Sequence, residues 1–241
     1  MATATLETPR YTLREHVTWQ EYENLLKEYD ERPVRLTYDR GHLEIMILSL
    51  GHEGYSYLLG RFVDVLTEEL AIPVKAGRST TFKREDLERG LESDNCYWIR
   101  NERAMRGKKE FDITRDPPPD LALEIDITRS SLDRMGIYAA LQVSEVWRFN
   151  GASIRVYKFG KDQQYKPCSQ SPTFPFLQMA KVLQFLKESE TRDETSLVRS
   201  FRAWVRKTIV PTWKKTRKPK LSAQKPAKRR KNKGKKQGGS E

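Results

Sequence analysis

The spacing of apolar residues along the chain predicts alternating helices and strands. A first helix, over 18–29, begins at a capping box in which Thr18 and Glu21 satisfy free backbone amides of the first turn. Helical spacing predicts further helices at 52–70, 131–141, 174–187 and 194–207. Period-two or β-branched patterns predict strands at 35–38, 42–47, 74–76, 80–83, 121–127, 145–149 and 153–159. This order is typical of an α/β domain with a mixed β-sheet flanked by helices.

The segment PPPDLALEIDITRSS, residues 117–131, alternates apolar and acidic residues. On a strand, its leucines and isoleucines share one face, and the other face carries Asp120, Ala122, Glu124 and Asp126. Three carboxylates on one face repel each other and need compensation. Two interpretations are open: a solvated face of an edge strand, and a site that holds a metal ion.

The spacing of these acids suits a hard cation such as Mg²⁺ or Mn²⁺. Glu124 and Asp126 are two apart, so their Cα atoms lie roughly 6.7 Å apart with parallel side chains. Asp120 lies roughly 13 Å from Glu124 on a regular strand and reaches the same ion only if the chain bends after 117–119. Structural ion pairs also hold acids in this way, so the spacing alone leaves both interpretations open.

With 241 residues, the chain is long enough for one sizeable domain with a core, or at most two small ones. No apolar run approaches the about 20 residues that cross a bilayer, so no membrane partner is expected. The start, MATATLETPR, lacks the basic and apolar regions of a secretory signal. Cys96 and Cys168 are expected to be free thiols of a reduced, cytoplasmic protein.

The positive charge is concentrated at the C-terminus. The chain carries a net +12, but residues 206–241 hold 15 Lys and Arg against one acid, a net +14. The remaining 205 residues have 30 Lys and Arg against 32 Asp and Glu, a net −2. We therefore expect three segments: an N-terminal arm at 1–14, a folded domain at 15–207 and a disordered Lys/Arg-rich tail at 208–241.

The tail is a candidate arm for DNA. Its densest basic run is Lys228, Arg229, Arg230 and Lys231. Binding of such a run to phosphates releases counterions, so it is sensitive to salt and blind to sequence. A solubilising appendage is the alternative interpretation.

Several spaced features share the pattern of one known family. They are PD-LALE at 119–124, Arg134 four residues before Tyr138, VSEVW at 143–147, and an upstream GHLEIM…HE segment with Gly41, Met46 and His52. Over residues 15–205 they resemble the Uma2 (DUF820) family of restriction-endonuclease-like proteins. The resemblance implies the PD-(D/E)XK nuclease fold, with Asp120 and Glu124 as metal ligands.

Two positions depart from the pattern that the resemblance implies. The lysine usual two residues after the second acid is Asp126 here, and the lysine common on the following helix is Arg134. Arginine keeps its proton and cannot help to activate water, although it can stabilise the charge of a phosphoryl transition state. Lys83 is the remaining candidate for the amine. Glu44 is either a further ligand that orients water or an outward-facing edge residue.

The leading hypothesis is a Mg²⁺-dependent endonuclease that hydrolyses DNA phosphodiester bonds. Asp120, Glu124 and Asp126 would hold the ion, Arg134 would offset charge in the transition state, and Glu44 would assist. The alternative is a nuclease-fold protein that has lost its chemistry and serves as a nucleic-acid-binding or regulatory module. A non-nucleic substrate is a third interpretation, permitted by the net −2 of the domain. Cutting both strands would call for a twofold homodimer.

Overall fold

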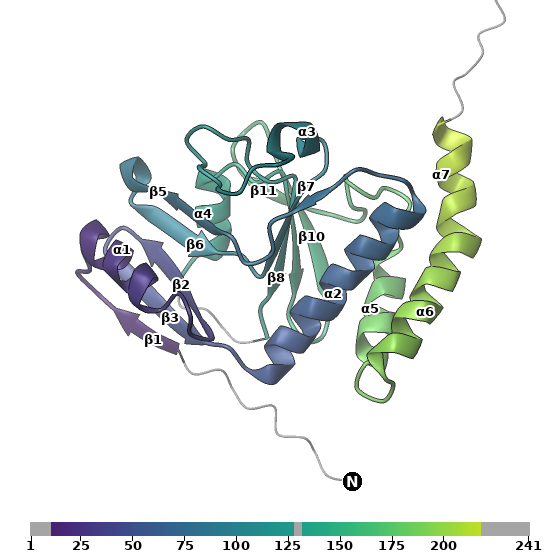
Figure 1. The fold of residues 1–241 in the computed structure, drawn as a ribbon, viewed down its shortest axis with the longest axis horizontal. Coiled ribbons are helices and arrows are strands. Elements are labelled where there is room, and N and C mark those ends of the chain that lie inside the picture. The colour runs from purple at the N-terminus through teal and green to yellow at the C-terminus, as the bar shows by residue number, and fades with distance from the viewer. Residues whose placement is uncertain (1–10, 128–131, 218–241) are drawn as a thin grey trace, which may run out of the picture.

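The computed structural model describes residues 11–127 and 132–217, which form two β-sheets with helices packed against them (Figure 1). The six-stranded sheet has the order β11-β10-β9-β8-β7-β4, with bounds Lys75–Ala76 (β4), Asn95–Trp98 (β7), Leu121–Ile125 (β8), Glu145–Phe149 (β9), Ile154–Phe159 (β10) and Tyr165–Cys168 (β11). The five-stranded sheet has the order β1-β3-β2-β6-β5, with bounds Tyr11–Arg14 (β1), Val34–Asp39 (β2), His42–Ile47 (β3), Thr81–Arg84 (β5) and Arg89–Glu92 (β6).

The helices cover both sheets, and α1 packs on the five-stranded one. Their bounds are Trp19–Glu28 (α1), Leu50–Glu69 (α2), Glu102–Met105 (α3), Arg134–Ala140 (α4), Met179–Glu188 (α5), Glu194–Trp204 (α6) and Val210–Arg217 (α7), with a 3₁₀ turn at Glu85–Leu87 and a π-helical segment at Val205–Ile209. Helices α2, α5 and α6 pack together on one face, whereas α4 contacts β6 of the smaller sheet (Figure 1). Within the described residues, none of the helices combines the length and apolar character needed to span a bilayer.

Local sequence explains where the first two long helices begin. Thr18 and Glu21 form the predicted capping box, with the Thr18 amide donating to the Glu21 carboxylate at 2.7 Å. Helix α2 begins at Leu50, before the predicted position 52, because the Ser49 hydroxyl accepts from the His52 amide at 3.2 Å and caps it. These caps fix the N-terminal ends of the helices that cover the two sheets.

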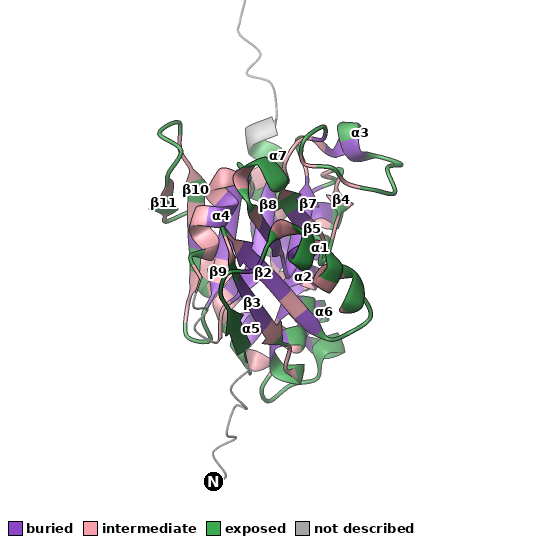
Figure 2. Ribbon diagram, turned by 90° about the vertical axis from the view of Figure 1, so that its left-hand side faces the viewer, coloured by how far each residue is buried: buried purple, intermediate pink, exposed green. Residues whose placement is uncertain are grey.

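The position of β8 follows from its connection. Strands β8 and β9 are parallel, and the crossover between them contains α4. All five residues of β8 are buried, and buried residues gather along β2, β7 and β8, whereas α1 is largely exposed (Figure 2). The interpretation of this strand as a solvated edge is therefore wrong, and Glu124 lies in the interior.

The predicted fold class, a mixed α/β fold flanked by helices, is confirmed. The prediction of a single mixed sheet was wrong, because the strands divide between two sheets. Strands β1, β6, β7 and β11 were not predicted. Strand β1 lies within the segment predicted as an arm, and the C-terminal helical region continues to Arg217, beyond the predicted boundary at 207.

Candidate functional site

Arg134, the first residue of α4, joins strands of both sheets. Its Nε and Nη2 donate to the two carboxylate oxygens of Glu124 on β8 at 2.8 and 2.9 Å. Nη2 also donates to the carbonyl of Glu92 on β6 at 2.9 Å, and Nη1 donates to the hydroxyl of Thr37 on β2. The side chain is only 10% exposed. A planar guanidinium can form this fork, whereas the single ammonium of lysine cannot.

Glu124 is enclosed by its partners. The Tyr138 hydroxyl donates to Oε1, which already accepts from Arg134. Burial raises the pKa of Glu124, the charge of Arg134 lowers it, and the nearby Asp94 raises it again. The Glu124 carboxylate in turn raises the pKa of Arg134 against the effect of burial. The Arg134 guanidinium keeps its proton in proteins and lies 2.8 Å from the Glu124 carboxylate, which is the distance of an ion pair.

A second acid, Asp94, stands opposite Glu124. The antiparallel ladder pairs Asn95 of β7 with Leu123 of β8, so the preceding and following residues, Asp94 and Glu124, are also opposite each other. Asp94 is buried, and its Oδ2 accepts from the Ile125 amide at 2.7 Å. Asp94 was not among the residues predicted from the sequence. The structure thus brings together an acid pair at the junction of the two sheets.

The other oxygen of Asp94 faces two cationic side chains. Its Oδ1 lies 3.4 Å from Nε2 of His52 and 3.9 Å from Nε of Arg35. All three atoms are buried, and within the described part of the chain none makes a hydrogen bond. Asp94 therefore keeps one oxygen that lies beside positive charge without a well-aligned hydrogen bond.

His52 carries a positive charge at neutral pH. Burial lowers its pKa, but the carboxylates of Asp94 and Glu53 outweigh burial and raise the pKa to about 9. Nδ1 lies 3.3 Å from the Glu53 carboxylate and Nε2 faces Asp94, so both ring nitrogens are next to acids. His52 is thus a third cation beside the acid pair, and it is buried, whereas Arg35 and Arg134 are partly buried.

We expect the chain to lose stability at alkaline pH. The pKa of His52 is about 6.5 in an unfolded chain and about 9 in the folded one. Its contribution, up to about 3 kcal/mol, is fully present below pH 6.5 and is lost as the pH rises through 9. Thermal unfolding between pH 6 and 10 measures this, and His52→Gln should flatten the profile, whereas the exposed His42→Gln should not. A His52→Gln profile parallel to that of the wild type would contradict the charge assignment.

Asp120 lies at the opposite end of β8. The chain bends at Asp120, just before β8 begins at Leu121, and the Asp120 amide donates to the carbonyl of Tyr97 at 2.9 Å. Its carboxylate accepts from the backbone amides of 99–101 and from Nε of Arg100, at 2.8 to 3.1 Å. The structure therefore keeps the Asp120 carboxylate away from Glu124, bound to the loop that follows β7.

Of the other predicted residues, Asp126 and Glu44 lie near the acid pair, and Lys83 lies at the surface. Asp126 accepts from Nε of Arg148 at 2.8 Å, and burial raises its pKa. Glu44 is buried, stands opposite Thr37 in the β2–β3 ladder, and its charge raises the pKa of Asp126. Lys83 is half-exposed and pairs with Glu23 at 2.7 Å, away from the acid pair. The basic run Lys228, Arg229, Arg230 and Lys231 lies outside the described residues.

The side chains around Glu124 do not fit the divalent ion that the resemblance implies. Mg²⁺ requires several oxygen ligands in nearly octahedral geometry. Both oxygens of Glu124 already accept from Arg134 or Tyr138, and Asp126 is paired with Arg148. Over residues 11–127 and 132–217, no group of three His, Cys, Asp or Glu side chains is arranged for a metal. The Arg134 guanidinium supplies at Glu124 the positive charge that an ion would bring.

Comparison with known proteins identifies the family. The family described as "Uma2: Putative restriction endonuclease" matches residues 19–190, which is most of the chain. The matched segment includes the acid pair, His52 and Arg134. No curated protein matches the chain in sequence. The chain belongs to the Uma2 family.

Proposed function

We propose that this chain binds DNA through a nuclease fold without a divalent ion and does not hydrolyse it. The family description indicates a nuclease, and restriction-endonuclease-like families generally use divalent metals. One observation carries the proposal for this chain: the Arg134 fork engages both oxygens of Glu124. An arginine at this position neutralises the acid permanently, but it cannot accept a proton from water.

The charge distribution supports a polyanionic partner. Residues 206–241 carry a net +14, and the exposed cations Arg199, Arg206 and Lys207 line a hollow on the C-terminal helical region that leads into this segment. Arg206 is partly neutralised by Glu69, at 2.8 Å, which leaves the later residues as the main basic element. Attraction of this kind depends on salt and not on DNA sequence.

The expected result is DNA binding that needs no divalent ion: it persists in EDTA, and Mg²⁺ weakens it only as added salt does. Removing residues 218–241, which contain 10 Lys and Arg, should weaken binding about 10- to 100-fold at low salt and reduce its salt dependence. Electrophoretic mobility shift with a short duplex measures both effects, and supercoiled plasmid incubated with Mg²⁺ or Mn²⁺ should stay intact. DNA binding that requires Mg²⁺, or that survives the truncation unchanged, would contradict the proposal.

The second candidate is the Mg²⁺- or Mn²⁺-dependent endonuclease on DNA. The observation in its favour is the acid pair, because Asp94 stands opposite Glu124 and keeps one oxygen without a hydrogen bond. In that case purified protein nicks plasmid in Mn²⁺, and Glu124→Ala abolishes nicking. Equal nicking by both proteins would point to contamination. Cutting both strands would further require a twofold dimer.

A further inference from the structure

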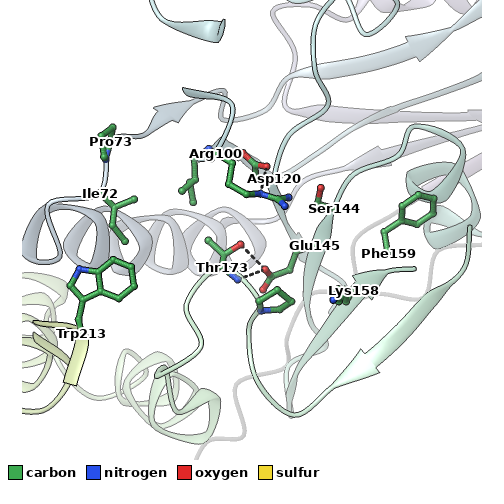
Figure 3. Close-up of a pocket in the computed structure, with 12 residues that line it drawn as sticks. Ile72, Pro73, Arg100, Asp120, Ser144, Glu145, Lys158, Phe159, Thr173 and Trp213 are labelled. Carbon is green, nitrogen blue, oxygen red and sulfur yellow. Dashed lines mark hydrogen bonds and ion pairs between the residues drawn. The ribbon is translucent and has the colours of Figure 1, made fainter. Parts of the chain in front are cut away.

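A cavity of about 460 Å³ lies at the end of β8 that carries Asp120 (Figure 3), and Glu124 does not line it. Its walls come from segments that are distant in the sequence: the loop after α2, the loop after β7, the start of β9, the end of β10 and α7. A volume of this size is within the range of small-molecule sites. The Uma2 assignment and the proposed function make no use of this cavity.

The two acids in the cavity wall are already satisfied. Asp120 accepts from three consecutive backbone amides and from Arg100. Glu145 accepts from the indole of Trp147 at 2.5 Å, and from the amide and hydroxyl of Thr173 at 2.9 and 2.6 Å (Figure 3). Both carboxylates therefore stabilise the wall and leave little capacity for a ligand cation.

The hydrogen-bond donors in the wall, in contrast, are largely without partners among the residues that the structure describes. The Arg100 side chain is 70% exposed, and only its Nε donates to Asp120. Lys158 is exposed, and its ammonium forms no ion pair with an acid of the described residues. The Ser144 hydroxyl likewise makes no hydrogen bond within the described part of the chain. Two cations and a hydroxyl on one wall suit a tetrahedral oxyanion.

The opposite wall is apolar and flat. It consists of Ile72, Pro73 and the indole ring of Trp213, which lie on the far side of the cavity from Ser144 and Lys158 (Figure 3). Trp213 is held by a hydrogen bond from its Nε1 to the carbonyl of Leu70 at 3.1 Å and by an edge contact with Phe176. A fixed aromatic face of this kind favours a planar ring.

We propose that this cavity binds a nucleoside monophosphate, either free or as the 5′-phosphorylated end of a DNA strand. The phosphate contacts Arg100, Lys158 and Ser144, and the base lies against Trp213 and Pro73. The site is separate from Arg134 and Glu124, so it does not depend on the function proposed for them.

Calorimetric titration of the full-length chain at physiological salt tests the proposal. Deoxyadenosine monophosphate should bind one-to-one with a dissociation constant of about 10–100 µM, whereas deoxyadenosine and inorganic phosphate should each bind at least about tenfold more weakly. Lys158→Gln should weaken binding of the monophosphate about tenfold, and Ser144→Ala should weaken it about threefold. Lys187→Gln removes an exposed lysine on α5, outside the cavity, and should change nothing.

A titration with 5′-phosphorylated and unphosphorylated oligonucleotides separates the two sources of the ligand. A preference for the phosphorylated strand that Lys158→Gln abolishes assigns the site to DNA ends, and an effect on the free nucleotide alone assigns it to mononucleotides. Absence of saturable binding by the wild type, or equal binding by Lys158→Gln and wild type, overturns the proposal. Ser144→Ala removes only a hydroxyl and serves as the second variant if Lys158→Gln does not fold.

Discussion

Replacing Arg134 by methionine will destabilise the chain by about 3–5 kcal/mol. The methionine fills much of the same volume but removes every donor that Glu124, Thr37 and the Glu92 carbonyl receive from the guanidinium. Glu124 then remains buried between the sheets without its counter-charge. Because Arg134 joins β8 to β2 and β6, the loss also removes a link between the two sheets. Urea or thermal unfolding followed by circular dichroism measures the change.

Arg148→Met, at an arginine of the same sheet, is the reference for this loss of stability. Arg148→Met breaks the ion pair with Asp126, but Arg148 is 40% exposed, so water can replace it at a cost of about 1 kcal/mol or less. The double variant Arg134→Met with Glu124→Leu should recover part of the lost stability, because it removes the unpaired acid together with its partner. An Arg134→Met variant as stable as Arg148→Met would contradict the role of the fork.

Replacing Asp120 by alanine will also destabilise the chain, by about 3–5 kcal/mol. Three consecutive backbone amides, at 99–101, then lose their acceptor at the point where the chain leaves β7. If Asp120 instead held a metal ion, its removal would chiefly abolish metal uptake, with little effect on folding in EDTA. Chemical unfolding in EDTA measures the difference. Asp162→Ala, at an exposed acid paired with Lys166, is the control and should leave stability nearly unchanged.

Much of the fold follows from local sequence patterns. The capping box at Thr18 and the helical spacing behind it gave α1, and the alternation in 121–125 gave β8. Strand β6, with the sequence RGLE, is half charged, and β11 contains Pro167, so neither shows a strand pattern by itself. Both are strands because neighbouring strands pair with them. The division into two sheets depends on these pairings and is not encoded in any local window.

The site residues could likewise be predicted only where the contact is local in the sequence. Glu124 and Arg134 are ten residues apart, and the sequence pattern selected both. Asp94 was not predicted as a site residue, because it comes next to Glu124 only through the β7–β8 register, across 30 residues of sequence. A local signal was present, since Asp94 directly precedes an apolar strand, but many surface acids do so. The role of Asp120 could not be inferred either, because its donors come from a loop about 20 residues earlier in the chain.

The central claim is that Arg134 provides the positive charge that a divalent ion would otherwise bring to Glu124. Titration of Mn²⁺ into the metal-free wild type, followed by calorimetry, tests it most directly. The account predicts no saturable uptake up to on the order of 1 mM, in the wild type and in Glu124→Gln alike. One-to-one uptake by the wild type at much lower Mn²⁺ concentration, abolished in a folded Glu124→Gln variant, would contradict it.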